Sequence, residues 1–193
     1  MIGRDQQWKL IIQIHNLTKA LVLKCEEIDP DHEFYFPIII QQRDALDHLI
    51  RAAYMEHYPD KLLAEKKGIV NASEYSIHQT SKALGHMYRA FFDAADWISI
   101  LCRERISDMM SAYSMKTIHF AFPSYISRIK FRIEEISLEI ANVRNSKDIG
   151  QTGEVIDGVD KYMDLVSELI NFMDEIQNKI PDLNKAEFEK AEP

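Results

Sequence analysis

Glycine and proline are scarce in this sequence, with six of each among 193 residues. Average proteins carry about 7 per cent glycine and 5 per cent proline, so few positions here favour turns or interrupt a helix. Nearly half of the residues are hydrophobic, which is enough for a sizeable core and argues against a disordered chain. We therefore predict an all-α fold, a single helical bundle of four to five helices.

Long apolar runs are also missing. No stretch reaches the roughly 18 consecutive apolar residues that a membrane-spanning helix needs, and the first residues, MIGRDQQW, lack the apolar core of a signal peptide. Cysteine occurs only as Cys25 and Cys102, each inside an apolar helical pattern, so we expect buried free thiols and no disulfide scaffold. These absences predict a cytoplasmic protein that does not bind a membrane.

Four common catalytic signatures are absent: a glycine-rich phosphate loop, His-Glu-x-x-His, paired Cys-x-x-Cys and Gly-x-Ser-x-Gly. The di-iron site of a ferritin-like bundle needs two Glu-x-x-His motifs on different helices. Neither is present, because His48, His78 and His86 are not preceded by glutamate at that spacing. We therefore expect no metal site and no cofactor.

The net charge of −8 is concentrated in the C-terminal third. Residues 133–193 contain 15 acidic and 6 basic side chains, whereas the first 132 residues contain 16 acidic and 17 basic ones. An acidic surface repels nucleic acid, but a nearly neutral one does not. RNA therefore stays a candidate ligand of the first 132 residues, while the acidic third suits a protein partner with a basic surface.

Apolar residues that recur every three or four positions predict three helices in the first 112 residues. The first covers residues 4–28. The second covers residues 33–57, with Pro37 marking its start because proline is accepted only in the first turn. The third covers residues 73–112 and is about 60 Å long at 1.5 Å per residue. Their apolar faces are predicted to be Leu10, Ile14, Leu17, Leu21 and Cys25; Ile39, Leu46, Leu49, Ile50 and Ala53; and Leu84, Met87, Phe91, Ala94, Ile98 and Leu101.

The most regular pattern lies further along. Two series of apolar residues step alternately by three and four positions: Phe122, Ile126, Ile129, Ile133, Ile136, Ile140 and Val143, then Val159, Tyr162, Val166, Leu169, Met173, Ile176 and Ile180. Such a pattern over three heptads is typical of packed helices. A glycine-containing loop over residues 144–157 joins the two series, which predicts a C-terminal antiparallel hairpin. The alternative is that one series packs against a second copy of the chain.

The hairpin completes the predicted single domain, residues 1–180. The last residues, 181–193, begin with a proline and are rich in charge. We therefore predict a flexible, charged C-terminal tail.

Two rows of polar side chains lie on the second and third predicted helices. The row on the second helix spans an arc of about 140°, opposite the predicted apolar face. The row on the third helix spans about 80° and borders its apolar face. The two rows are Arg43, Asp44, Asp47, His48 and Arg51, and His86, Arg89, Asp93 and Asp96. They fit either solvent-exposed ion pairs or a polar cleft in which the rows face each other.

The segment Arg43-Asp44-Ala45-Leu46-Asp47-His48 resembles the Arg-x4-His motif of the HEPN superfamily, small all-helical bundles of prokaryotic toxin–antitoxin, CRISPR and phage-defence systems. The resemblance implies a metal-independent endoribonuclease, or an inactive relative, in which two protomers bring their motifs together across a dimer interface. It implies that Arg43 binds the scissile phosphate and that His48 acts as general acid or base. Asp44 and Asp47 would orient them. The likeness extends over six residues and the fold class.

Two other functions fit the same sequence. A non-catalytic interaction or regulatory subunit would use the two heptad series or the acidic C-terminal third as its contact surface. A sensor of a small molecule or metal would use a pocket between the second and third helices. The candidate partners are therefore a second copy of this chain, RNA, or another protein.

Overall fold

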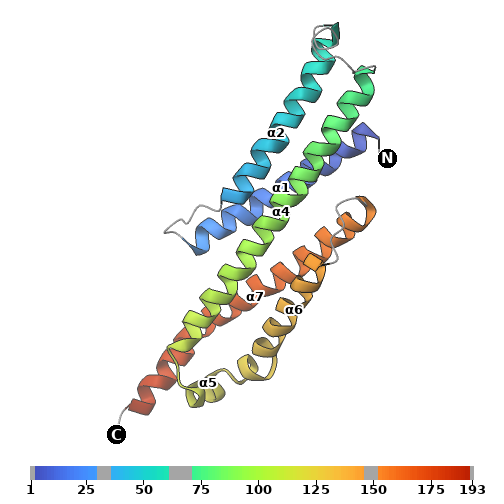
Figure 1. The fold of residues 1–193 in the computed structure, drawn as a ribbon. Coiled ribbons are helices and arrows are strands. Elements are labelled where there is room, and N and C mark those ends of the chain that lie inside the picture. The colour runs from blue at the N-terminus through green and yellow to red at the C-terminus, as the bar shows by residue number, and fades with distance from the viewer. Residues whose placement is uncertain (1–2, 30–35, 61–70, 146–151, 192–193) are drawn as a thin grey trace. The chain divides into compact units, whose positions relative to one another are not determined.

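A computed structural model describes residues 3–29, 36–60, 71–145 and 152–191. Within these ranges the chain is helical and contains no strand (Figure 1). The helices are α1 (Arg4–Ile28), α2 (Phe36–His57), α4 (Ala72–Ser111), α5 (Met115–Ala121), a π-helical turn η1 (Tyr125–Ile129), α6 (Lys130–Asn145) and α7 (Thr152–Ala191). The all-α prediction is confirmed, although the described ranges hold six α-helices where four to five were predicted.

The chain divides into two compact units where one domain was predicted. The first consists of residues 1–26 and 31–96, and the second of residues 27–30 and 97–193. Helix α4 contributes to both, since its residues up to Asp96 belong to the first unit and those from Trp97 onward belong to the second. In the described residues, no helix is both long enough and apolar enough to cross a membrane.

The bounds of the first three predicted helices agree with α1, α2 and α4 to within a few residues. Pro37 is the second residue of α2, where its missing N–H would have had no helical partner. Helix α4 begins after Asn71, whose side-chain oxygen accepts hydrogen bonds from the backbone N–H of Ser73 and Glu74 at 2.9 and 3.4 Å. Such an N-terminal cap satisfies amides that the first turn leaves without partners.

Helices α1 and α4 bury most of the apolar residues that the sequence predicted. Leu10, Ile14, Leu21 and Cys25 of α1 are buried. On α4, buried positions include Leu84, Met87, Phe91, Ala94 and Ile98. Both cysteines are buried free thiols, as predicted.

Helix α2 buries a different face from the predicted one. Ile39, Leu46 and Ile50 are 43%, 58% and 60% exposed. The buried residues are instead Ile38, Ala45, Ala52 and Met55. The prediction was wrong because α2 has apolar residues on two sides, and its small alanines let the backbones of neighbouring helices approach closely.

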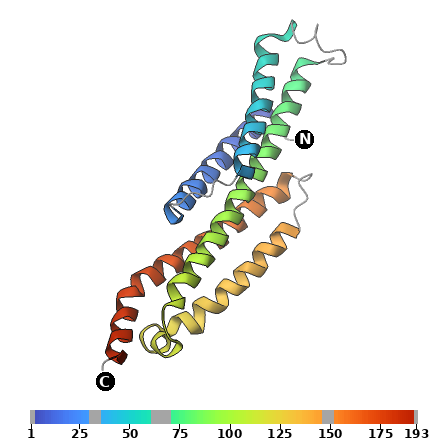
Figure 2. The ribbon, with the colours of Figure 1, turned by 60° about the vertical axis from the view of Figure 1, so that its left-hand side comes forward.

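The heptad series form the core of the second unit. Phe122, Ile129, Ile136, Ile140 and Val143 are buried in the first series, and Val159, Tyr162, Val166, Leu169, Met173 and Ile176 in the second. Helices α6 and α7 run side by side in both views (Figures 1 and 2). The predicted hairpin is therefore confirmed, and its seams pack within one chain.

Ion pairs link the hairpin along its outer edge. Arg132 of α6 bonds both carboxylate oxygens of Glu168 on α7 through two N–H groups, at 2.9 and 2.8 Å. The same guanidinium also reaches Glu139 at 2.8 Å and Glu135 at 3.3 Å. These carboxylates raise the pKa of Arg132. Bidentate geometry of this kind fixes the register of two helices more firmly than a single contact does.

Both predictions for the ends of the hairpin differ from the structure. Helix α6 continues to Asn145 and α7 starts at Thr152, so both ends of the predicted loop over residues 144–157 are helical. The predicted tail over residues 181–193 is helix through Ala191, although Pro181 lies inside it. Figure 2 shows α7 changing direction toward its C-terminal end, as expected where a proline removes a helical hydrogen bond.

Contacts with α5 and with Tyr113, just before it, hold the last turns of α7. Leu183 is fully buried. Asn184 accepts a 2.6 Å hydrogen bond from the Tyr113 hydroxyl, and Glu187 accepts one from the Thr117 hydroxyl. These contacts compensate for the bond lost at Pro181.

Substitution of Leu183 tests whether the last turns of α7 are packed. We expect Leu183→Ala to lower the free energy of unfolding by about 2–5 kcal/mol, the usual cost of a leucine-sized core cavity. Phe188→Ala, five residues further along the same helix at a 76% exposed position, should change it by no more than about 0.5 kcal/mol. Urea unfolding followed by circular dichroism measures both. Equal, small effects would show that the end of α7 is not packed.

Candidate functional site

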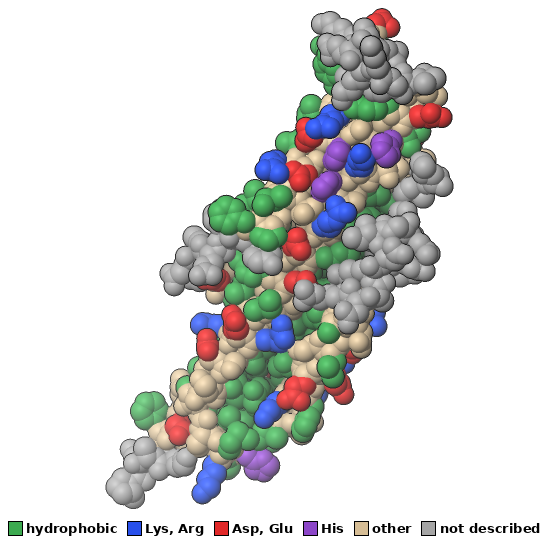
Figure 3. All heavy atoms as spheres, viewed as in Figure 1, with side chains coloured by type: hydrophobic (Ala, Val, Ile, Leu, Met, Phe, Trp, Pro, Cys, Tyr) green, Lys and Arg blue, Asp and Glu red, His purple; other side chains and the backbone are tan. Residues whose placement is uncertain are grey.

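Two histidines meet between α2 and α4 in the first unit. The imidazole rings of His48 and His86 stack with centroids 5.3 Å apart and an interplanar angle of 23°. Both side chains are half-buried. Figure 3 shows histidine and cationic side chains gathered on one face over these helices. The structure thus brings together one histidine from each of the two predicted polar rows.

A reciprocal pair of hydrogen bonds fixes the two rings. Nδ1 of His48 lies 2.7 Å from Oε1 of Gln79 on α4, and Nδ1 of His86 lies 2.8 Å from Oε1 of Gln41 on α2. A carbonyl oxygen can only accept, so Nδ1 carries the proton and donates in both cases. With Nδ1 committed to a glutamine, Nε2 is the ring nitrogen of each histidine that exchanges a proton.

Neither glutamine was among the predicted site residues, although the sequence contains a signal for them. Gln41 precedes His48 by seven residues, and Gln79 precedes His86 by seven. Seven residues are almost two helical turns, so each glutamine shares a helix face with its histidine. Two antiparallel copies of this Gln-x6-His pattern place each glutamine opposite the other helix's histidine.

Asp44 lies beside both histidines and also binds Arg43. Its Oδ1 accepts hydrogen bonds from two nitrogens of the Arg43 guanidinium, at 3.0 and 2.7 Å. The pKa of Asp44 is lowered, first by this hydrogen bond and also by electrostatic interactions with Arg43, His86 and His48, while burial opposes them. The carboxylate is therefore ionised at neutral pH and links Arg43 to the histidine pair.

The environment of His86 favours its neutral form. Burial lowers the pKa of His86 most, and the nearby charges of Arg89 and His48 lower it further, while Asp44 opposes them. His86 therefore holds its proton less firmly than a free imidazole does. At neutral pH it can accept a proton, as a general base must.

The remaining predicted residues do not join the pair. The Arg43 side chain is 71% exposed and is connected to the histidines only through Asp44. Asp47 forms an ion pair with Arg51 at 2.6 Å, one turn along α2. Asp93 and Asp96 lie further along α4, half-buried. Of the two polar rows, His48, His86 and Asp44 form the site, whereas Asp47 and Arg51 form an ordinary ion pair on the helix surface.

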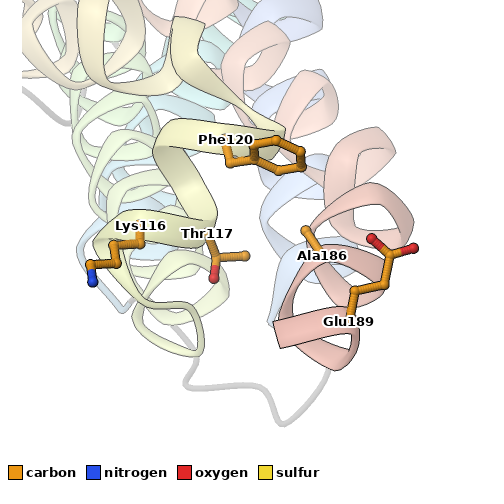
Figure 4. A pocket seen from close by; sticks show the side chains of 5 residues that line it. All are labelled: Lys116, Thr117, Phe120, Ala186 and Glu189. Atoms are coloured by element: carbon orange, nitrogen blue, oxygen red, sulfur yellow. The ribbon is translucent and has the colours of Figure 1, made fainter. Parts of the chain in front are cut away.

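Two other kinds of site, a metal centre and a ligand pocket, have weaker support among the described residues. Throughout those ranges, no group of three or more histidine, cysteine, aspartate or glutamate side chains is arranged to hold a metal ion. A cavity of about 430 Å³ lies in the second unit between α5 and α7. Phe120 points across it toward Ala186, while the charged ends of Lys116 and Glu189 point away (Figure 4). That cavity therefore lacks convergent polar groups.

Comparison with protein-family models, curated proteins and solved structures found no match to this chain.

The titration of His86 tests the geometry of the pair. Because its folded pKa lies below the usual value of about 6.5, its contribution to stability is complete above pH 6.5 and is lost as the pH falls through the folded pKa. We expect the imidazole NMR signal of His86 to titrate below pH 6.5. Arg89→Gln should move its midpoint upward and make the loss of stability in acid smaller. Lys179→Gln, on α7, is the control and should leave the midpoint unchanged. A midpoint that Arg89→Gln does not move would contradict the proximity of Arg89 to the ring.

Proposed function

We propose that this chain is a HEPN-like, metal-independent endoribonuclease whose acid–base groups are His48 and His86. The observation that carries the proposal is the stacked pair of imidazoles with both Nδ1 atoms committed to glutamines. Two imidazoles within one site can supply a general base and a general acid, which cleavage of an RNA backbone requires. An enzyme acting on cellular RNA would work in the cytoplasm.

The proton transfers of the proposed reaction need no group beyond the two histidines and the substrate. Nε2 of neutral His86 removes the proton of a ribose 2′-hydroxyl, and the resulting oxygen attacks the adjacent phosphorus. The bond from phosphorus to the 5′-oxygen breaks, and protonated His48 donates its proton to that leaving oxygen. The products are a 2′,3′-cyclic phosphate and a 5′-hydroxyl, so atoms and charges balance.

Arginine would supply the positive charge that the phosphate requires. Two of the five N–H donors of Arg43 bond Asp44, which leaves the others for a phosphate oxygen. Arg89 is exposed on α4 and lowers the pKa of His86 by its charge. It is therefore close enough to the pair to attract an RNA backbone. Arg89 is thus the nearer cation to the pair, and Arg43 is connected to it through Asp44.

A cleavage assay on labelled RNA in EDTA tests the proposal. The wild type should cleave, and His48→Ala and His86→Ala should each lower the rate by about 100-fold or more, the usual cost of losing a general acid or base. His78→Ala is the matched control, because His78 lies on α4 two turns before His86 and is exposed. It should retain the wild-type rate.

The end groups of the products provide a second readout. The proposed chemistry predicts 2′,3′-cyclic phosphate ends that only the wild type and His78→Ala generate. Cleavage that survives in both His48→Ala and His86→Ala would come from a contaminating nuclease and would refute the proposal, as would intact RNA with the wild type across structured and single-stranded substrates.

A second candidate function is a non-catalytic interaction subunit. The heptad series offer little contact surface, because most of their residues are buried within the chain. This function is favoured by the row of large apolar side chains that α2 exposes. Phe36 is 69% exposed and Ile50 is 60% exposed. Apolar patches of this kind mark protein contact sites. This function predicts no RNA cleavage by the wild type, together with an association that Ile50→Glu abolishes.

A further inference from the structure

Helix α4 carries a cationic surface beside the histidine pair. Residues 75–92 of this helix contain no aspartate or glutamate. Lys82 and Arg89 are exposed, and they precede and follow His86 by four and three residues. At the spacing of an α-helix the three side chains fall within an arc of about 60°, so they lie on one side of α4. Figure 3 shows basic and histidine side chains gathered on one face of the first unit.

The two cations of this surface are available to a ligand. Among the residues that the structure describes, Lys82 and Arg89 form no ion pair. Asp44, the carboxylate beside the histidines, is bound to Arg43. The charge of Arg89 acts on the histidine pair, since it lowers the pKa of His86. An anion that approaches His86 therefore meets positive charge on both sides along α4.

Gly85 lies on the same side of α4, about 60° around the helix from Lys82. Glycine destabilises the interior of a helix relative to alanine, so a glycine inside this 40-residue helix calls for a packing or functional reason. Packing does not supply one, because a Cβ at Gly85 would have no neighbour within 4 Å among the described residues, apart from the backbone of its own helix. The missing side chain instead leaves open space in which the backbone of a ligand can approach α4 closely. We define Lys82, Gly85 and Arg89 as the phosphate track.

The length of the phosphate track suits a nucleic-acid strand. Lys82 and Arg89 are about 10.5 Å apart along the axis of α4, at 1.5 Å per residue. A stacked strand advances about 3.4 Å per nucleotide, so the two cations are separated by about three nucleotide steps. A line of charge on one helix contacts one backbone, whereas proteins that bind double-stranded RNA contact phosphates across its grooves. The phosphate track therefore fits a single strand.

We propose that a single strand of nucleic acid binds along the phosphate track, with Lys82 and Arg89 contacting phosphates on either side of the one that lies at His86. This path rests on the proposed ribonuclease function for the reaction at His86, and it adds the class and the direction of the substrate strand. Contacts to phosphates do not distinguish ribose from deoxyribose. Single-stranded DNA should therefore bind to the phosphate track and, because it lacks the 2′-hydroxyl that the reaction needs, should inhibit cleavage without being cleaved.

The salt dependence of DNA binding tests the path without requiring cleavage. The probe is a fluorescent oligothymidine of about 12 nucleotides, within the usual range of single-strand sites. The logarithm of its binding constant falls with the logarithm of the salt concentration by about 0.7 for each phosphate contact. Lys82→Gln and Arg89→Gln should each reduce this slope by about 0.7, and the double variant by about 1.4.

Lys161→Gln, at an exposed position of α7, is the control and should leave the slope unchanged. A wild type that does not bind the oligothymidine would overturn the proposal. So would a double variant with the wild-type slope, or a DNA duplex of the same length that binds as tightly as the single strand.

Gly85 allows a test in which stability and binding change in opposite directions. Gly85→Leu should raise the melting temperature, because leucine has a higher helix propensity than glycine and the position is surrounded by open space. The same side chain fills that space and should weaken binding of the oligothymidine by about tenfold. Gly85→Ala should raise the melting temperature as well and weaken binding less. A stable Gly85→Leu protein that binds as tightly as the wild type would overturn the path along α4.

Failure of the ribonuclease reaction and failure of the phosphate track give different results. A wild type that binds the oligothymidine with the expected slopes but leaves RNA intact would refute the reaction and retain the phosphate track. A wild type that cleaves RNA, with a slope that the double variant does not change, would refute the phosphate track and retain the reaction. If both hold, the oligothymidine should inhibit RNA cleavage by the wild type and inhibit the double variant less.

Discussion

The close approach of α2 to α4 determines the properties of the first unit. Ala45 and Ala52 are buried on α2, and Ala83 and Ala90 on α4. Side chains of this size allow a short interhelical distance. At that distance the side chains of His48 and His86 span the gap, and each Nδ1 reaches a glutamine oxygen within 2.8 Å. The stack of the two rings and the hydrogen bonds of both Nδ1 atoms depend on this packing, and the pKa of His86 is lowered first by its burial.

The same packing explains why α2 exposes so much apolar surface. A helix buries one stripe, and α2 has apolar residues on two sides. The alanine side faces inward, so the larger isoleucines, Leu46 and Phe36 remain in contact with solvent. Burying one such side chain contributes about 1.5–3 kcal/mol. A partner that covers these residues would be stabilised by a similar free energy for each one. The histidine site and the exposed apolar side chains of α2 both follow from which face of this helix is buried.

The second unit depends on a simpler constraint. Its two heptad series contain large aliphatic side chains on one side of each helix, with charged residues on the other. The acidic character of α7 is partly balanced across the hairpin, where Arg128 bonds Glu175 and Arg132 bonds Glu168. Arg128 also lies over the ring of Phe172, with 5.5 Å between its guanidinium carbon and the ring centroid. Cationic side chains of α6 therefore neutralise part of the negative charge concentrated in the last third.

The sequence by itself determined the all-α class, the bounds of α1, α2 and α4, and the hairpin seams, because helical periodicity and heptad spacing are local properties of the chain. It also identified His48 and His86 as members of two polar rows. Only the tertiary structure decided which side of α2 is buried, since residues on both sides satisfy the helical pattern and the difference arises from the fit against α4. It likewise decided that α7 continues beyond Pro181, because distant contacts from Tyr113 and Thr117 outweigh a local helix-breaking residue. The meeting of His48 with His86, and the separation of Arg43 from both, depend on that same long-range packing.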